Sequence, residues 1–146
     1  MVSYFHFLRA LHGQDVDFLA LVQGEGIPCL WQDHVTSWLA NPYQANLLII
    51  KYEDLLTQPI PELKKFCNFV EVEREEEIIK KVIEQTSFSK MRQREIKQGW
   101  EDENWPKDKL FIRRGKSGSY RDEMPPAVLE KFLEKASPIL EKFGYL

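Results

Sequence analysis

A short apolar run over residues 46–52 constrains the fold more than any other feature of this sequence. It reads Asn46-Leu47-Leu48-Ile49-Ile50-Lys51-Tyr52 and follows a turn predicted at Asn41-Pro42. A continuous apolar stretch of this length is typical of a parallel strand that is covered on both faces. One strand cannot form a sheet, and the only other candidate, residues 1–5, could equally begin a helix. The sequence therefore predicts an α/β fold, mostly helices around a parallel sheet that is incomplete in this chain.

Helical patterns account for much of the remaining sequence. Apolar and aromatic side chains recur at helical spacing over residues 31–38, and similar apolar stripes over 61–70 and 75–85 predict two more helices. The helix over 75–85 has acidic residues in its first turn, where the helix dipole favours them. Pro125-Pro126 begins a last helix, which we expect Pro138 to kink or split.

The composition excludes several classes of protein. With 146 residues, of which 43% are hydrophobic, the chain is long enough for one domain with a core. It has no apolar run long enough for a membrane helix and no signal-peptide pattern, so we expect a cytoplasmic protein without a membrane partner. A net charge of -3 gives no indication of nucleic-acid binding. Cys29 and Cys67 have no Cys or His at metal spacing, so we expect buried free thiols and no metal.

Residues 111–118 are unusually basic for an acidic protein. Three cations and two glycines fall within six residues of the sequence Phe-Ile-Arg-Arg-Gly-Lys-Ser-Gly. Glycine allows positive φ and brings backbone N–H groups close to a ligand, and the arginine guanidinium presents a fork of donors that matches phosphate oxygens. This pattern predicts an anion-binding loop, and the alternative is a solvated basic loop.

Five separated segments, in order along the chain, resemble motifs of the cytosolic-type sulfotransferases that use 3'-phosphoadenosine 5'-phosphosulfate (PAPS). They are Ser3-Tyr4-Phe5-His6-Phe7, similar to the end of a nucleotide-binding segment; Trp31 to Trp38, similar to WxxHVxxW; Lys51-Tyr52-Glu53-Asp54-Leu55, similar to a strand-end KYEDL; Thr86 to Met91, similar to TSFxxM; and residues 111–115, similar to FxRKG. The resemblance spans nearly the whole chain and implies the C-terminal part of a P-loop-like sulfotransferase fold.

The resemblance implies that one group of residues binds the 3'-phosphate of the nucleotide. Ser3 and Arg113 match a serine and an arginine that contact this phosphate in the family. Backbone N–H groups at Arg114 and Gly115 match groups that assist, and Ile112 belongs to the same loop. The family usually has lysine where Arg114 stands, a change that a backbone role tolerates. An arginine and a hydroxyl also suit a dianionic phosphate chemically.

The resemblance implies that a second group of residues binds the adenine base. Tyr52 matches a tyrosine near the base, Thr86 a residue that contacts it, and Phe88 an aromatic residue against its ring. Phe88 offers a flat apolar surface that suits a purine. Without the family, Tyr52 is interpreted as capping the edge of a sheet, and Phe88 as filling the core after the helix over 75–85.

Two motifs of the family are not in this sequence: the PKSGTTW-type loop that contacts the 5'-phosphosulfate, and the histidine that acts as catalytic base. His34 is interpreted as a packed histidine, and His6 and His12 have no carboxylate partner at a convincing spacing. We therefore expect a single partial domain over residues 1–146, from a truncated or split gene, without a catalytic residue. The family's dimer motif KxxxTVxxxE is not found either, so no oligomeric state is predicted.

The reaction that the resemblance implies is the transfer of a sulfuryl group from PAPS, as co-substrate, to a hydroxyl or amine of a small-molecule acceptor. Adenosine 3',5'-bisphosphate (PAP) is left behind. This chain would supply the 3'-phosphate and adenine contacts but not the base, so we expect it to be inactive in isolation. Two alternatives are a non-catalytic nucleotide- or partner-binding protein derived from a sulfotransferase, and a helical module whose basic loop meets an acidic surface.

Overall fold

The computed structural model describes residues 1–13 and 15–146. Its contacts divide the chain into two compact units, one formed by Met1–Ala45 with Tyr120–Leu146 and the other by Asn46–Ser119. Ser3 belongs to the first unit, and the other predicted nucleotide-binding residues belong to the second. The single domain over residues 1–146 stays a prediction.

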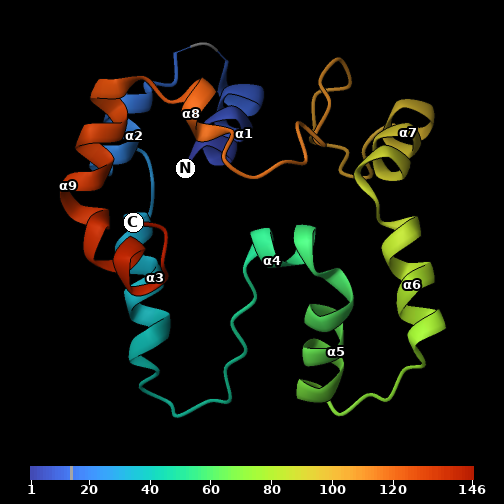
Figure 1. Ribbon diagram of the computed structural model, residues 1–146. Coiled ribbons are helices and arrows are strands. Elements are labelled where there is room, and N and C mark those ends of the chain that lie inside the picture. The colour runs from blue at the N-terminus through green and yellow to red at the C-terminus, as the bar shows by residue number, and fades with distance from the viewer. Residues whose placement is uncertain (14) are drawn as a thin grey trace. The chain divides into compact units, whose positions relative to one another are not determined.

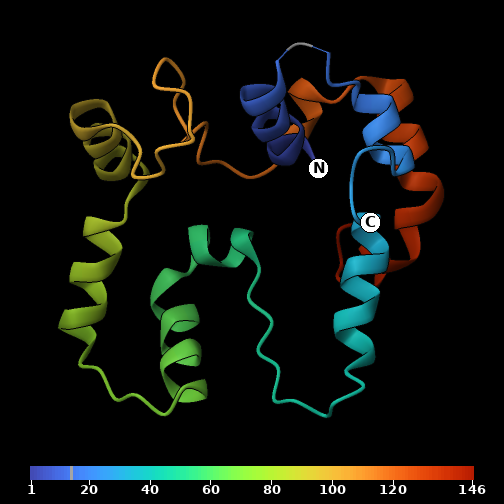
Figure 2. The same ribbon diagram turned by 180° about the vertical axis from the view of Figure 1, so that it is seen from behind.

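The helices of the first unit are α1 (Val2–His12), α2 (Phe18–Gln23), α3 (Trp31–Ala40), α8 (Tyr120–Glu123) and α9 (Pro126–Lys142). α9 packs against α2 and α3, as Figures 1 and 2 show from opposite sides. The prediction that a helix begins at Pro125-Pro126 is confirmed, but Pro138 lies inside α9 without splitting it. Across the described ranges, no helix has both the length and the apolar character needed to cross a membrane.

One apolar cluster forms the core of the first unit. It joins residues from α1, α2 and α9 with Met124, which precedes α9; the buried members are Val2, Phe18, Leu21, Val22, Met124 and Val128. The ring of Phe5 stacks on that of Phe18, with 4.1 Å between their centroids. Burying a large apolar side chain contributes about 1.5–3 kcal/mol, so this cluster holds the three helices together.

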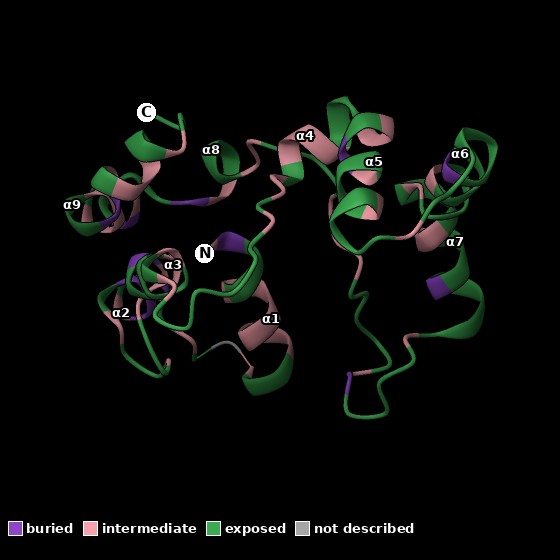
Figure 3. Ribbon diagram, turned by 90° about the horizontal axis from the view of Figure 1, so that it is seen from below, coloured by how far each residue is buried: buried purple, intermediate pink, exposed green. Residues whose placement is uncertain are grey.

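The second unit contains four consecutive helices, α4 (Tyr52–Thr57), α5 (Pro59–Phe69), α6 (Glu76–Gln85) and α7 (Phe88–Gln98). Each packs against the next one in the chain. Residues 99–119 follow as turns and irregular structure. Figure 3 shows that buried residues are sparse along these elements.

The strand predicted over residues 46–52 is not formed. Residues 44–51 have no regular secondary structure, and Tyr52 begins α4 instead of ending a strand. In the other candidate segment, residues 1–5, Met1 is the N-cap of α1 and residues 2–5 form its start. Because no strand occurs in the part of the chain that the structure describes, the apolar run has no neighbour with which to pair its backbone groups. The parallel sheet stays a prediction.

Both cysteines are free, as expected. Cys67 on α5 is half-buried, but Cys29 is exposed, so the expected burial of its thiol is wrong. Cys29 lies in the connection between α2 and α3, where the chain runs over the surface. Among the described residues, no group of three or more His, Cys, Asp or Glu side chains is placed to hold a metal ion.

Candidate functional site

The predicted anion-binding segment, residues 111–118, forms an irregular loop in the second unit; we call it the basic loop. Gly115 has φ +62° and Gly118 has φ +73°, which confirms that glycines turn the chain here. Arg113 and Arg114 precede the first of these turns and are half-buried. The basic loop is tied to the start of α4, because the Ser117 hydroxyl donates a hydrogen bond of 3.2 Å to a carboxylate oxygen of Glu53.

The ring of Phe88 lies directly against the backbone of Gly115. A Cβ atom added to Gly115 would fall only 2.1 Å from Cδ2 of Phe88, so no other residue fits here without movement. Phe88 is the first residue of α7, and 40% of its surface is exposed. The interpretation of Phe88 as a core side chain is therefore wrong. The structure instead brings together two predicted nucleotide-binding residues that are far apart in the sequence.

Tyr52 and Thr86 lie at helix ends of the same unit. Tyr52 is the first residue of α4 and is 49% exposed. Since the described chain has no sheet, Tyr52 caps no sheet edge there, contrary to the interpretation made without the family. Thr86 follows α6, and its hydroxyl donates a hydrogen bond of 2.7 Å to the carbonyl of Val82. The lone pairs of this hydroxyl oxygen still allow it to accept a hydrogen bond from a ligand.

Ser3 is exposed on α1 in the first unit. The remaining residues predicted to bind nucleotide, namely Tyr52, Thr86, Phe88, Ile112, Arg113, Arg114 and Gly115, all belong to the second unit. The role of Ser3 in phosphate binding stays a prediction.

Two charged side chains of α7 that support the basic loop were not singled out from the sequence. Glu95 is only 4% exposed, and its carboxylate accepts hydrogen bonds from the backbone N–H groups of Phe111 and Ile112, the latter at 3.0 Å. The Arg92 guanidinium donates to the backbone carbonyl of Ile112. Phe88, Arg92 and Glu95 follow one another at i, i+4 and i+7, so they share one face of the helix. This spacing is the signal that could have identified them.

Two tryptophans anchor the first residue of the basic loop. Trp100 stacks on Phe111 with 4.0 Å between ring centroids, and Trp105 meets Phe111 edge-on at 5.1 Å. Trp105 is 8% exposed, and its indole N–H donates a hydrogen bond of 2.8 Å to the carbonyl of Lys109. Aromatic pairs of this kind contribute about 0.5–1.5 kcal/mol beyond their buried area.

His6 does have a carboxylate partner, contrary to the expectation from spacing. Its Nε2 lies 2.9 Å from Oε2 of Glu123, which joins α1 to α8 inside the first unit. The partners are 117 positions apart, so no local spacing could reveal them. His34 is exposed and meets the Trp38 ring edge-on at 6.4 Å, so it packs against one ring at the surface.

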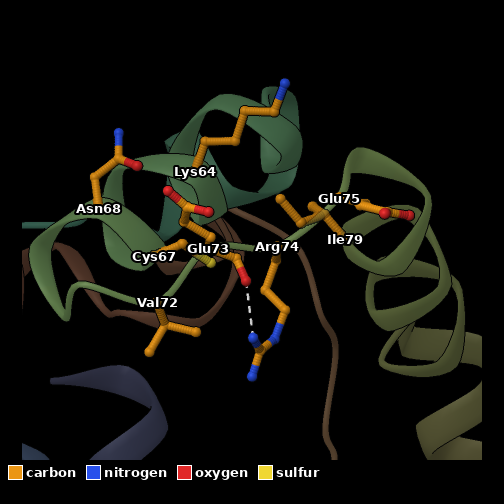
Figure 4. Close-up of a pocket in the computed structure, with 8 residues that line it drawn as sticks. All are labelled: Lys64, Cys67, Asn68, Val72, Glu73, Arg74, Glu75 and Ile79. Carbon is orange, nitrogen blue, oxygen red and sulfur yellow. Dashed lines mark hydrogen bonds between the residues drawn. The ribbon is translucent and has the colours of Figure 1, made fainter.

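A cleft of about 570 Å³ lies beside α5 and α6 (Figure 4). It is lined by Lys64, Cys67, Asn68, Val72, Glu73, Arg74, Glu75 and Ile79. Lys64 pairs with Glu76 at 2.7 Å, and together with Lys80 it holds the pKa of the Glu76 carboxyl below its ordinary value. The cleft carries charges of both signs and includes none of the residues predicted to bind nucleotide.

The sequence matches the family model described as "Sulfotransferase domain" over residues 1–144. Human Sulfotransferase 1C2 is 27% identical over 143 residues, which cover 92% of this chain and 48% of that protein. Mouse Sulfotransferase 1 family member D1 is 30% identical over 147 residues, with the same coverage of 92% and 48%. The chain therefore spans about half the length of the curated relatives it matches.

Solved structures agree with this match. The crystal structure of mouse sulfotransferase SULT7A1 complexed with PAP aligns at a TM-score of 0.72 and 26% identity, covering 93% of this chain and 54% of that one. Retinol dehydratase in a complex with retinol and PAP aligns at a TM-score of 0.76 and 22% identity, covering 95% of this chain and 43% of that one. The described helices follow the sulfotransferase fold.

Proposed function

From the premise that this chain belongs to the sulfotransferase family, we propose that it provides the 3'-phosphate and adenine contacts of a PAPS-dependent enzyme. The observation that carries this proposal is the packing of Phe88 against Gly115, beside Arg113 and Arg114. It places an exposed aromatic ring next to a glycine turn in a cationic loop. The reaction would be sulfuryl transfer to a hydroxyl or amine of a small-molecule acceptor.

The chemistry of the basic loop fits a dianionic phosphate. Its eight residues contain three cations, Arg113, Arg114 and Lys116, and no acid. The Arg113 guanidinium offers paired donors to phosphate oxygens, and Gly115 at φ +62° lets backbone N–H groups approach them closely.

The adenine contacts would come from the helix ends around α7. Because 40% of Phe88 is exposed, its ring can still receive a purine while it rests on Gly115. Thr86 lies two residues earlier and offers its hydroxyl oxygen as an acceptor. Tyr52 is half-exposed on α4 and offers a second aromatic side chain. These residues would hold the nucleotide in one orientation. Orienting the reactants in this way is a major source of rate acceleration in group transfer.

We expect the chain alone to bind nucleotide without turnover. Bound PAPS supplies the sulfuryl group, and the acceptor must lose a proton to a base during transfer. No residue of this chain is assigned as that base, and the PKSGTTW-type loop is not in its sequence. The chain would therefore act as the C-terminal region of a sulfotransferase, with the base and the 5'-phosphosulfate loop supplied by another segment.

The missing motifs also favour a second candidate, a non-catalytic nucleotide- or partner-binding protein derived from a sulfotransferase. Both candidates predict that PAP binds. They differ when an N-terminal half from a related sulfotransferase is added in trans, because only the enzyme region regains transfer of label from PAPS to phenols or alcohols. Robust turnover by the chain alone would contradict both.

The first experiment is a calorimetric titration of the chain with PAP, together with Arg113→Ala and a control, Arg94→Ala. Arg94 is exposed on α7 and carries the same charge. We expect saturable binding by the wild type and a loss of about tenfold or more in Arg113→Ala, the effect of one charge-assisted hydrogen bond. Arg94→Ala should bind like the wild type. Failure of the folded wild-type chain to bind PAP would refute the proposal.

A further inference from the structure

We infer that Glu95 of α7, assisted by Arg92, is a positioning residue that orients the basic loop toward the 3'-phosphate. This inference rests on the proposed function and deepens it, because it assigns a role to residues that would not touch the nucleotide. Glu95 would act through the backbone that immediately precedes Arg113.

Glu95 carries a charge that is almost fully buried. A carboxylate that is 4% exposed is costly unless hydrogen bonds satisfy it. Here two consecutive backbone N–H groups, those of Phe111 and Ile112, donate to its two oxygens. Such charge-assisted bonds are roughly twice as strong as neutral ones. The carboxylate and the start of the basic loop therefore hold each other in place.

Side chains of α7 hold both backbone polar groups of Ile112. Its N–H donates to Glu95 at 3.0 Å, and its carbonyl accepts from the Arg92 guanidinium. Fixing the peptide groups on both sides of Ile112 fixes its φ and ψ angles. Arg113 is the next residue, so these two bonds fix the peptide group from which its Cα atom and side chain extend.

The same face of α7 also supports the loop on the other side of the arginines. Phe88 lies one turn before Arg92 on this face and contacts Gly115. Arg113 and Arg114 thus stand between two supported points, Ile112 and Gly115. A loop held at both ends loses less conformational freedom when it binds an anion, which raises its affinity.

The inference predicts a selective defect. PAP and adenosine 5'-monophosphate (AMP) differ only in the 3'-phosphate, so a variant that misorients Arg113 should lose affinity for PAP and keep its affinity for AMP. A general loss of structure would weaken the binding of both nucleotides. The ratio of the two dissociation constants therefore separates positioning from folding.

The test uses Glu95→Gln in the full chain, with Glu101→Gln as the control. Glu101 is exposed, and its replacement by glutamine removes the same negative charge. The glutamine amide would keep one acceptor but turn a donor toward a backbone N–H group, which breaks one bond of the pair. NMR titrations should show about tenfold weaker binding of PAP by Glu95→Gln and no change for AMP. In the absence of nucleotide, the amides of Phe111 and Ile112 should exchange with solvent faster than in the wild type.

Arg92→Lys, with Arg94→Lys as its control, keeps the inference testable if Glu95→Gln does not fold. Lysine keeps the charge but not the guanidinium geometry, so the ratio of the PAP dissociation constant to the AMP dissociation constant should rise here as well. An unchanged ratio in the folded variants would overturn the inference while the proposed function stood. If the wild type bound neither nucleotide, the proposed function would fail. The positioning role of Glu95 would then be tested by amide exchange alone. Exchange at Phe111 and Ile112 that is equally fast in wild type and variant would then refute the positioning role.

Discussion

Gly115 leaves almost no room for a side chain in the basic loop. In Gly115→Ala the new Cβ would meet the Phe88 ring at 2.1 Å, and the residue would have to keep φ +62°. Either the ring or the loop must move, so we expect PAP binding to weaken more than tenfold. The strained backbone and the clash should together lower the free energy of unfolding by about 1–3 kcal/mol. Calorimetry and urea denaturation measure the two effects.

Gly26→Ala separates the clash from the backbone strain. Gly26 has φ +70°, but a Cβ atom there would meet nothing within 4 Å. This variant should lose only the smaller backbone contribution, about 1 kcal/mol, and bind PAP like the wild type. Equal losses of PAP affinity in the two variants would show that the contact with Phe88 has no part in the site.

The bond between His6 and Glu123 links the side chains of α1 and α8, and a single substitution removes it. The Glu123 side chain is only 14% exposed, so water can reach its carboxylate only in part. Removing the imidazole therefore takes away a hydrogen-bond partner that water replaces poorly. We expect His6→Ala to lower the free energy of unfolding by about 1–2 kcal/mol. His12→Ala, at an exposed position of the same helix, should change it by less than about 0.5 kcal/mol. Urea denaturation followed by circular dichroism tests this, and equal effects would argue against the link.

Helices could be predicted from the sequence because their signals are local. α3 ends at Ala40 before the predicted turn, and α9 begins at Pro126 as expected. The strand over residues 46–52 could not be settled in this way, because a strand exists only where a second strand pairs with it. Hydrogen bonds between residues far apart in the sequence could not be predicted for the same reason. Glu95 meets amide groups 16 and 17 positions away, and its only local signal is the i, i+4, i+7 spacing that it shares with Phe88 and Arg92.

At the scale of the whole molecule, the unpaired apolar run should make the isolated chain self-associate. Leu47 and Ile49 are 41% and 53% exposed in a segment of high β-propensity without charge or proline from residue 46 to 50. Ile49→Lys should reduce light scattering at a given concentration, because a charge in such a segment opposes strand pairing. Tyr43→Lys changes a residue that is 92% exposed but lies outside the run, so it should have little effect. Equal scattering by the wild type and Ile49→Lys would assign the association to another surface.

The stack of Trp100 on Phe111 closes residues 101–110 into a loop whose two ends meet. Doubling the length of such a loop costs only about 0.6 kcal/mol of closure entropy, and its residues other than Trp105 and Pro106 are exposed. The chain can therefore gain or lose residues here while Glu95 keeps its hold on Phe111 and Ile112. Relatives can diverge at the exposed positions of this segment without disturbing the arginines that follow it, whereas Trp105 is constrained because it packs against Phe111.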